Sequence, residues 1–178
     1  MNYIIFDLEA TCTSDRSQKF QNEIIEIGAV KINDKLEIID EYQSFIKPIL
    51  NPKLTDFCKE LTSIKQSDVD SADKFPIVIS EFMDWVGDDS ILCSWGFYDK
   101  KQIISDLQLH KTKWFFDHIS LKHQHADFKR LRKGVGVQKA LSMEQMTFEG
   151  VHHRGIDDAK NIAKIFIKNF DKWDFDKK

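Results

Sequence analysis

The sequence predicts a single α/β domain built around a mixed β-sheet. Three observations lead to this fold class. Strand-like segments follow one another up to residue 47, helical periodicity dominates afterwards, and one more short apolar strand interrupts the helical part. Because no repeat, low-complexity tract or linker divides the 178 residues, we expect one domain over 1–178, with only the last five or so residues frayed.

The expected strands come mostly first. Residues 2–10 are rich in Ile and Phe, and two further strand-like segments follow at 23–33 and 36–47. The turn signal Asn-Asp-Lys at 33–35 lies between these two segments, which predicts an antiparallel meander. A fourth, buried strand is expected over 90–95, after the helix-ending Gly-Asp-Asp.

Helices are expected where apolar residues recur every three or four positions. The predicted segments are 54–60, 75–86, 99–110, a long stretch over 115–146 with a break at Gly134 and Gly136, and 156–170. The last helix has one continuous apolar stripe. We also consider one more short strand near 115–117.

Composition narrows the function classes. Hydrophobic residues make up 42% and charged residues 31%, which is typical of globular proteins, and no apolar run is long enough to span a membrane. Cys12, Cys58 and Cys93 are widely spaced without a CxxC pair, and the N-terminus shows no cationic segment or cleavage site. We therefore expect reduced thiols, no signal peptide, no membrane partner and a cytoplasmic location.

The charge balance alone decides little. A net charge of −3 is not typical of a nucleic-acid-binding protein. Basic residues nevertheless crowd one stretch between Lys122 and Lys133, and a local patch can hold phosphates. Each of these side chains, taken singly, is equally consistent with a solvated helix face.

A pair of acids ends the first predicted strand. Asp7 and Glu9 lie two positions apart in the segment FDLEATC, so their side chains point to the same side of the strand. Paired carboxylates favour hard cations such as Mg²⁺ or Mn²⁺. A strand with one solvated face would show the same pattern, and the pair alone does not separate the two interpretations.

Two further motifs contain candidate site residues. Asp99 follows the short strand and opens a helix, where an acid is also favoured by the helix dipole. His153 and Asp158 occur in HHRGIDDAKNIAKIF, where the acids could simply cap the last helix and the histidine could be structural. Coincidence explains the occurrence of all three motifs in one chain less well than it explains any one of them alone.

In this order the motifs resemble those of the DEDDh exonucleases, in the ribonuclease-H-like superfamily. The family pattern is an acid-x-acid strand, a central Asp, and a His followed five positions later by Asp. It matches Asp7 with Glu9, then Asp99, then His153 with Asp158; the five-residue step is the reason for choosing His153 over its neighbour. Longer segments such as NEIIEIGAV and SWGFYDKKQI are similar to the KapD-type branch and to exoribonucleases that trim histone mRNA and small RNAs.

The resemblance implies a fold and a mechanism. The fold is a mixed five-stranded sheet of order 3-2-1-4-5 flanked by helices. The mechanism is a 3′→5′ hydrolysis of phosphodiester bonds with two divalent cations, Mg²⁺ or Mn²⁺, which stabilise the attacking and leaving oxygens. Asp7 would bridge the cations, Glu9 and Asp158 would complete one site, and Asp99 would hold the second cation. His153 would act as general base, so activity should fall below about pH 6.

The expected substrate is the 3′ end of single-stranded RNA or DNA, with RNA favoured by the resemblance, and with nucleoside 5′-monophosphates as products. In the family, the acid corresponding to Glu9 and the backbone around Leu8 and Ala10 recognise the terminal 3′-hydroxyl. Candidates for stacking on the terminal base are Phe57, Leu61 and Trp95, although core packing is favoured over stacking for each of them. Two alternatives stay open: a DNA-directed exonuclease of the proofreading type, and an inactive nucleic-acid-binding module. Protein partners cannot be inferred.

Overall fold

The structure, a computed structural model, describes residues 1–15, 17 and 19–175. A five-stranded sheet forms its centre, with β1 (Asn2–Ala10), β2 (Ile24–Ile32), β3 (Ile38–Phe45), β4 (Ser90–Ser94) and β5 (His118–Ser120). The strand order is β3-β2-β1-β4-β5. β1 pairs antiparallel with β2, and β2 pairs antiparallel with β3, whereas β4 runs parallel to both β1 and β5. The mixed sheet and its order are therefore confirmed.

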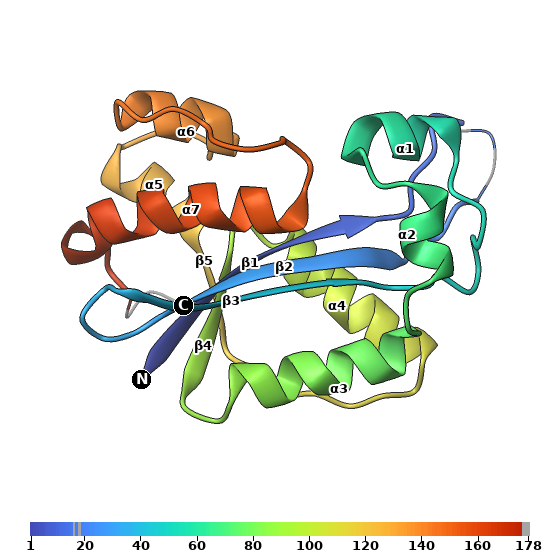
Figure 1. Cartoon of the computed structure of the whole chain (residues 1–178). Helices are drawn as coiled ribbons and strands as arrows, with labels where there is room; N and C mark the ends of the chain where they lie inside the picture. Colours follow the sequence, from blue (N-terminus) through green and yellow to red (C-terminus); the bar gives the residue numbers. More distant parts are fainter. Residues whose placement is uncertain (16, 18, 176–178) are drawn as a thin grey trace.

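Helices cover both faces of the sheet (Figure 1). The face at the top of the figure carries α7 (Gly155–Asn169), with α5 (Leu121–Phe128) and α6 (Val137–Met143) beyond it; the other face carries α3 (Phe75–Val86) and α4 (Tyr98–Leu109). Two short helices, α1 (Asp56–Thr62) and α2 (Gln66–Asp70), lie beyond the end towards which β1 points, and a 3₁₀ turn (Phe170–Lys172) follows α7. Within the described residues, none of the helices combines the length and apolar character needed to cross a bilayer.

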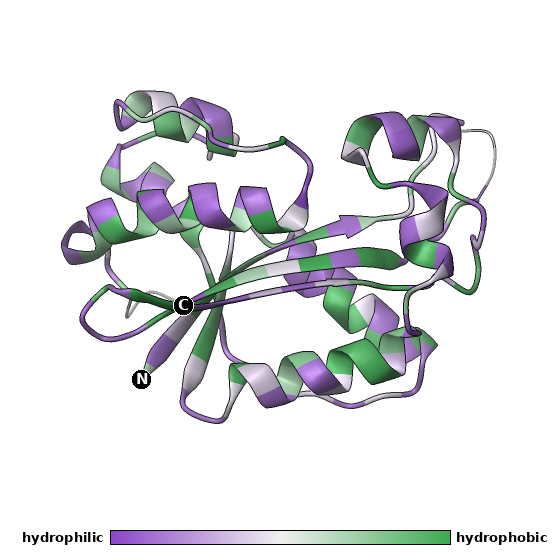
Figure 2. Ribbon diagram, in the orientation of Figure 1, coloured by the Kyte–Doolittle hydropathy of each residue, from purple (hydrophilic) through white to green (hydrophobic). Residues whose placement is uncertain are grey.

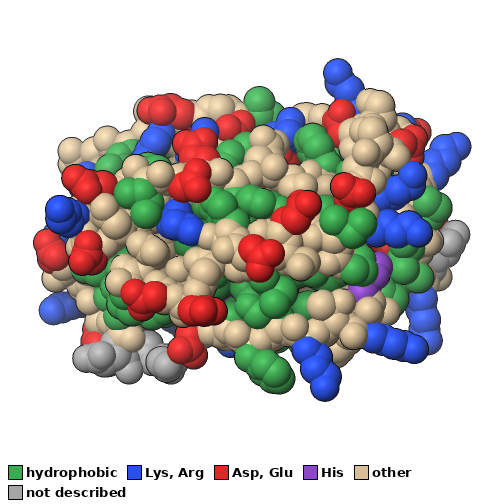
Figure 3. Space-filling model, turned by 60° about the horizontal axis from the view of Figure 1, so that its bottom comes forward, with side chains coloured by type: hydrophobic (Ala, Val, Ile, Leu, Met, Phe, Trp, Pro, Cys, Tyr) green, Lys and Arg blue, Asp and Glu red, His purple; other side chains and the backbone are tan. Residues whose placement is uncertain are grey.

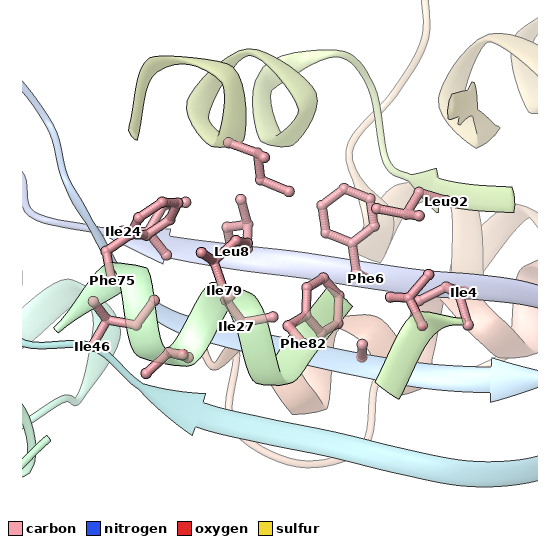
Figure 4. Close-up of a cluster of buried hydrophobic side chains, with 14 of the residues drawn as sticks. Ile4, Phe6, Leu8, Ile24, Ile27, Ile46, Phe75, Ile79, Phe82 and Leu92 are labelled. Atoms are coloured by element: carbon pink, nitrogen blue, oxygen red, sulfur yellow. The ribbon is translucent and has the colours of Figure 1, made fainter. Parts of the chain in front are cut away.

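Alternation along β1 gives the domain two cores. Phe6 and Leu8 point to the face that packs against α3, where a cluster of buried side chains includes Phe82 (Figure 4). Tyr3 and Ile5 point to the opposite face, into the cluster under α7. Figure 2 shows the apolar colouring of the central strands between helices whose turns alternate in hydropathy. A strand buried on both faces is rigid, which suits it to place groups at its end.

The long helical stretch predicted over 115–146 is wrong in part. Residues 113–117 form no regular secondary structure, and Trp114 and Phe116 pack against the core on the α3 side. The fifth strand begins at His118, just beyond the predicted 115–117. α5 ends where Arg130 adopts a positive φ of 54° and the N–H of Leu131 bonds to the Ala126 carbonyl, a typical helix-ending arrangement. A loop then leads to α6, after the predicted break.

Other boundaries differ less. The helix over 75–86 was predicted with the observed bounds, whereas no helix was predicted where α2 lies. The expected fraying falls partly on residues 176–178, which lie outside the described residues. Residues 174 and 175 are described, and Phe175 packs against the rings of Phe166 and Phe170.

Candidate active site

Three carboxylates meet where β1 ends. Asp7 and Glu9 continue the row of side chains on the α7 side of β1, and Asp158 comes from the first turns of α7. One oxygen atom from each of the three lies within 4.8 Å of the others. The alternation of the strand therefore places the two acids together, as the sequence indicated, and α7 supplies the third.

The electrostatics of this cluster are unfavourable without a cation. Burial, followed by the charges of Asp99, Asp158 and Glu9, raises the pKa of Asp7 well above its usual range. Burial and the neighbouring carboxylates raise the pKa of Glu9 to about 8. Burial is also the main cause that raises the pKa of Asp158. Such values mean that the fold opposes ionisation here, and a bound cation would reverse this effect.

Asp99 lies beside this cluster at the start of α4. It is buried, and burial raises the pKa of its carboxyl group to about 6, while hydrogen bonds with Ser94 and with the Leu8 backbone act in the opposite direction. It is not one of the three acids within 4.8 Å of one another, but its charge contributes to the raised pKa of Asp7. The parallel pairing of β4 with β1 brings this strand–helix junction to the end of β1.

A close backbone contact fixes the start of α7. A Cβ atom at Gly28 in β2 would lie 2.0 Å from the backbone nitrogen of Ile156, so only glycine allows the helix to approach this closely. Beside this contact the buried Glu26 accepts a hydrogen bond from the Gly155 N–H at 3.1 Å and pairs with Arg154, also at 3.1 Å. These contacts position the turn that precedes Asp158. Neither Glu26 nor Arg154 was among the predicted site residues.

The turn before α7 holds the two histidines against Asp158. His153 has a positive φ of 63°, and its backbone N–H donates to Asp158 Oδ2 at 2.7 Å. Its imidazole is partly buried; burial and the neighbouring His152 lower its pKa, which favours the neutral, proton-accepting form at neutral pH. The exposed His152 places Nε2 3.8 Å from Asp158 Oδ1. The His152 ring thus lies at the acids, and the His153 ring lies next to it, with their centroids 4.0 Å apart.

The predicted substrate contacts fall into different surroundings. Leu8 and Ala10 are buried in β1, while Phe57 and Leu61 on α1 expose 41% and 38% of their surface. Trp95 is half-buried, with Nε1 donating to the Val135 carbonyl at 2.8 Å.

The structure adds Tyr98, which the sequence analysis did not single out. Tyr98 precedes Asp99, is 53% exposed, and its hydroxyl accepts a hydrogen bond from Asn22 at 3.2 Å. The charges of Asp99 and Glu9 contribute to raising its pKa, which places the phenol near the acids. An exposed aromatic next to an acid at a helix start was the available signal.

Comparison with known proteins places this chain in a family. The sequence profile of the exonuclease family matches residues 4–166. The human protein named 3′-5′ exoribonuclease 1 is 33% identical over 177 residues, which cover 92% of this chain. The nuclease domain of 3′hExo, a DEDDh family member bound to rAMP, superposes with a TM-score of 0.89 at 32% identity, over 96% of this chain and 92% of that one.

A second similar structure is described as a 3′-exonuclease that recognises the 3′ end of a histone mRNA stem-loop. It has a TM-score of 0.86 and 31% identity, over 94% of this chain and 63% of that one. The match also spans only 51% of the length of the human relative. The likeness therefore concerns the nuclease part of longer proteins.

Proposed function

The chain belongs to the exonuclease family, and from this membership and its acidic site we propose that it is a metal-dependent 3′→5′ exonuclease. Its substrate would be the 3′ end of single-stranded nucleic acid, and its products nucleoside 5′-monophosphates. We propose RNA as the preferred substrate, because the similar proteins are named exoribonucleases. The observation that carries the proposal is the convergence of Asp7, Glu9 and Asp158 within 4.8 Å, with Asp99 beside them.

The donor set fits hard divalent cations. All of the converging side-chain ligands are carboxylate oxygens, which suit Mg²⁺ or Mn²⁺ better than the softer zinc or copper. The raised pKa values of Asp7 and Glu9 fit a site that a cation completes. When bound, two such cations stabilise the attacking and the leaving oxygens of an in-line displacement at phosphorus.

The remaining steps use this chain's own groups. His153 would accept the proton of the attacking water, because its lowered pKa keeps the imidazole neutral at neutral pH. Asp158 holds the backbone of His153 in place through its Oδ2. The backbone of Leu8 and Ala10 and the carboxylate of Glu9 would bind the terminal 3′-hydroxyl, and the exposed rings of Phe57 and Tyr98 would stack on the terminal base.

Release of mononucleotides tests the proposal. Matched single-stranded RNA and DNA oligonucleotides, labelled at the 5′ end, are incubated with Mg²⁺ or Mn²⁺ and with a chelator. We expect stepwise shortening from the 3′ end, faster on RNA, and abolished both by the chelator and by Asp7→Asn. Equal or faster hydrolysis of DNA would favour a proofreading-type substrate. Retained metal-dependent binding without any hydrolysis would favour an inactive binding module.

The doublet of histidines offers an internal control for the general base. Removing a general base typically costs about 10²–10⁴-fold in rate, so His153→Ala should lose activity on this scale while His152→Ala should lose much less. The measurement is kcat at saturating RNA and cation for both variants. A larger loss for His152→Ala would transfer the role to the exposed ring, whose Nε2 also faces Asp158.

A further inference from the structure

A groove lined by lysines lies next to the acids. It has a volume of about 580 Å³, a size typical of ligand-binding sites. Its walls come from the segment between β4 and α4, from the first turn of α4, from α5, and from the loop before α6. The lining residues include Phe97, Tyr98, Lys101, Lys122, His123 and Lys133. Three are lysines, and none is acidic, although the whole chain carries a net charge of −3.

Two of the polar side chains in the groove are held in place. A Cβ atom at Gly134 would lie 2.5 Å from Cγ of Lys122, so the missing side chain at Gly134 makes room for the lysine stem. The ring of His123 packs on Phe97 with centroids 4.9 Å apart, and its Nδ1 is 2.6 Å from the Ser120 hydroxyl. The groove thus presents a lysine with a packed stem and an exposed aromatic pair, features typical of surfaces that bind a nucleic-acid strand.

The groove adjoins the acidic site at Tyr98. Gly96, Phe97 and Tyr98 line it and lead directly into Asp99. Tyr98 belongs to both regions, because it lines the groove while the charges of Asp99 and Glu9 act on its hydroxyl group. A strand whose 3′ end reaches the acids would therefore meet the lysines with its preceding nucleotides.

We propose that this groove binds the phosphodiester backbone of the nucleotides on the 5′ side of the scissile bond. The inference rests on the proposed function, and it names a second binding site for the same substrate. Lys101, Lys122 and Lys133 contact phosphates, and Phe97 with His123 offers a surface on which a base stacks. Short substrates that end before the groove lack these contacts.

The surroundings separate this groove from ordinary surface lysines. Lys129 lies in the same basic stretch of sequence, but it forms an ion pair with Glu144 at 2.7 Å. On the face that carries α3 and α4, carboxylates are spread among the basic side chains (Figure 3). Only a subset of the stretch between Lys122 and Lys133 thus contributes to the groove, and Lys101 from α4 joins it.

Binding and turnover of substrates of two lengths test the proposal. The groove variant replaces Lys101, Lys122 and Lys133 with Gln. The control variant replaces Lys35, Lys74 and Lys111 with Gln; these side chains are exposed, lie outside the groove, and give the same change of net charge. Kd is measured by fluorescence anisotropy with 5′-labelled oligoadenylate of about 12 nucleotides, with both sets placed in the Asp7→Asn background to prevent hydrolysis.

The groove set should weaken binding on the order of tenfold, and three lost phosphate contacts should flatten the slope of log K against log salt by about 2. The control set should change neither. In the hydrolytically competent protein, the ratio of kcat/KM for the long oligonucleotide to that for a dinucleotide should fall, mainly through KM. Lys133→Gln alone, a change at an exposed side chain, should flatten the salt slope by about 0.7 and guards against misfolding of the triple variant.

The outcomes distinguish the two proposals. If the groove set matched the control set in binding and in its dependence on substrate length, the groove proposal would be overturned, even if the enzyme degrades RNA normally. A parent protein that hydrolyses no oligonucleotide, while the groove set still loses binding and salt dependence, would overturn the nuclease function and leave the groove standing.

Discussion

Buried carboxylates in this protein fall into two groups that differ in their neighbours. Glu23, just before β2, accepts hydrogen bonds from three successive backbone N–H groups, those of residues 49–51, at 2.6–2.8 Å. Glu26 is likewise bonded by Arg154 and the Gly155 N–H. Around Asp7 and Glu9, by contrast, the groups that act most strongly after burial are other carboxylates.

The difference separates structural acids from functional ones. A buried charge that accepts several hydrogen bonds is compensated by the fold itself. A buried charge that faces other acids destabilises the fold until something positive enters. Buried glutamates occur in both groups, Glu9 in one and Glu23 with Glu26 in the other, so the neighbours rather than burial identify the candidate site. Four experiments test this distinction.

The largest expected effect is stabilisation of the acidic site by a cation. Because only the folded chain gathers the ligands, a cation at about a thousand times its Kd should add about 4 kcal/mol to the free energy of unfolding. For a chain of this length that corresponds to a rise in Tm on the order of 10 °C. Thermal unfolding with Mn²⁺ and with chelator measures it. Asp7→Asn should lose most of this rise in Tm, whereas Asp84→Asn, a change at an exposed side chain, should keep it. Equal rises in Tm for the two variants would contradict a cation site at Asp7.

Removal of a structural acid should have the opposite signature. Glu23→Gln leaves one neutral acceptor for three backbone donors, so we expect a loss of about 3 kcal/mol in the free energy of unfolding, with little dependence on cations. Urea unfolding measures the loss, and the exposed Glu81→Gln serves as its control. If Glu23→Gln abolished cation binding while leaving stability unchanged, the division into two groups would fail.

Much of the fold follows from local sequence patterns. Ile and Phe in β1, and the spacing of apolar residues in α3 and α7, predict elements that the structure contains, because burial on one or two sides imposes these periods. The segment from Trp114 to Phe116 was misassigned because its aromatic residues pack against the α3 core from a distant part of the chain. That contact depends on tertiary structure, which a local pattern does not contain.

The site shows the same limit. The two-residue spacing of Asp7 and Glu9 indicates that they share one side of β1, since alternation is a local property. That Asp158 lies within reach of them depends on the approach of α7 to Gly28, and the pairing of Glu26 with Arg154 joins residues 128 positions apart. No spacing along the chain encodes these contacts. Only the family resemblance, which summarises a whole fold, indicated that the acids would meet.

Asp106 provides an intermediate case with a pH dependence. It is buried and accepts hydrogen bonds from the Ile24 N–H and from Gln102, yet burial raises its pKa to about 6, and the charge of Glu23 adds to this. Because the pKa of Asp106 in the folded protein lies above its unfolded value of about 3.9, its contribution to the free energy of unfolding is full below about pH 4. This contribution is lost as the pH rises through about 6. The free energy of unfolding of Asp106→Asn should therefore rise relative to that of the parent by at most about 2 kcal/mol between pH 4 and pH 7. Urea unfolding across this range measures it; a constant difference would contradict the raised pKa.

The smallest expected effect has the most informative sign. Without cation, Asp7→Asn removes a charge whose ionisation the fold opposes, since its pKa is raised well above the usual range. A group whose pKa is higher in the folded than in the unfolded protein makes its full contribution to stability below the unfolded pKa. That contribution is lost as the pH rises through the folded pKa, so at pH 8 the variant should be more stable than the parent. The expected gain is on the order of 1 kcal/mol, the size of an ordinary single substitution but with the less common sign. Urea unfolding in chelator at pH 8 measures it, and Glu23→Gln in the same buffer should be destabilised. A substitution that abolishes activity while stabilising the empty fold would show that Asp7 is retained for its ligand rather than for the architecture.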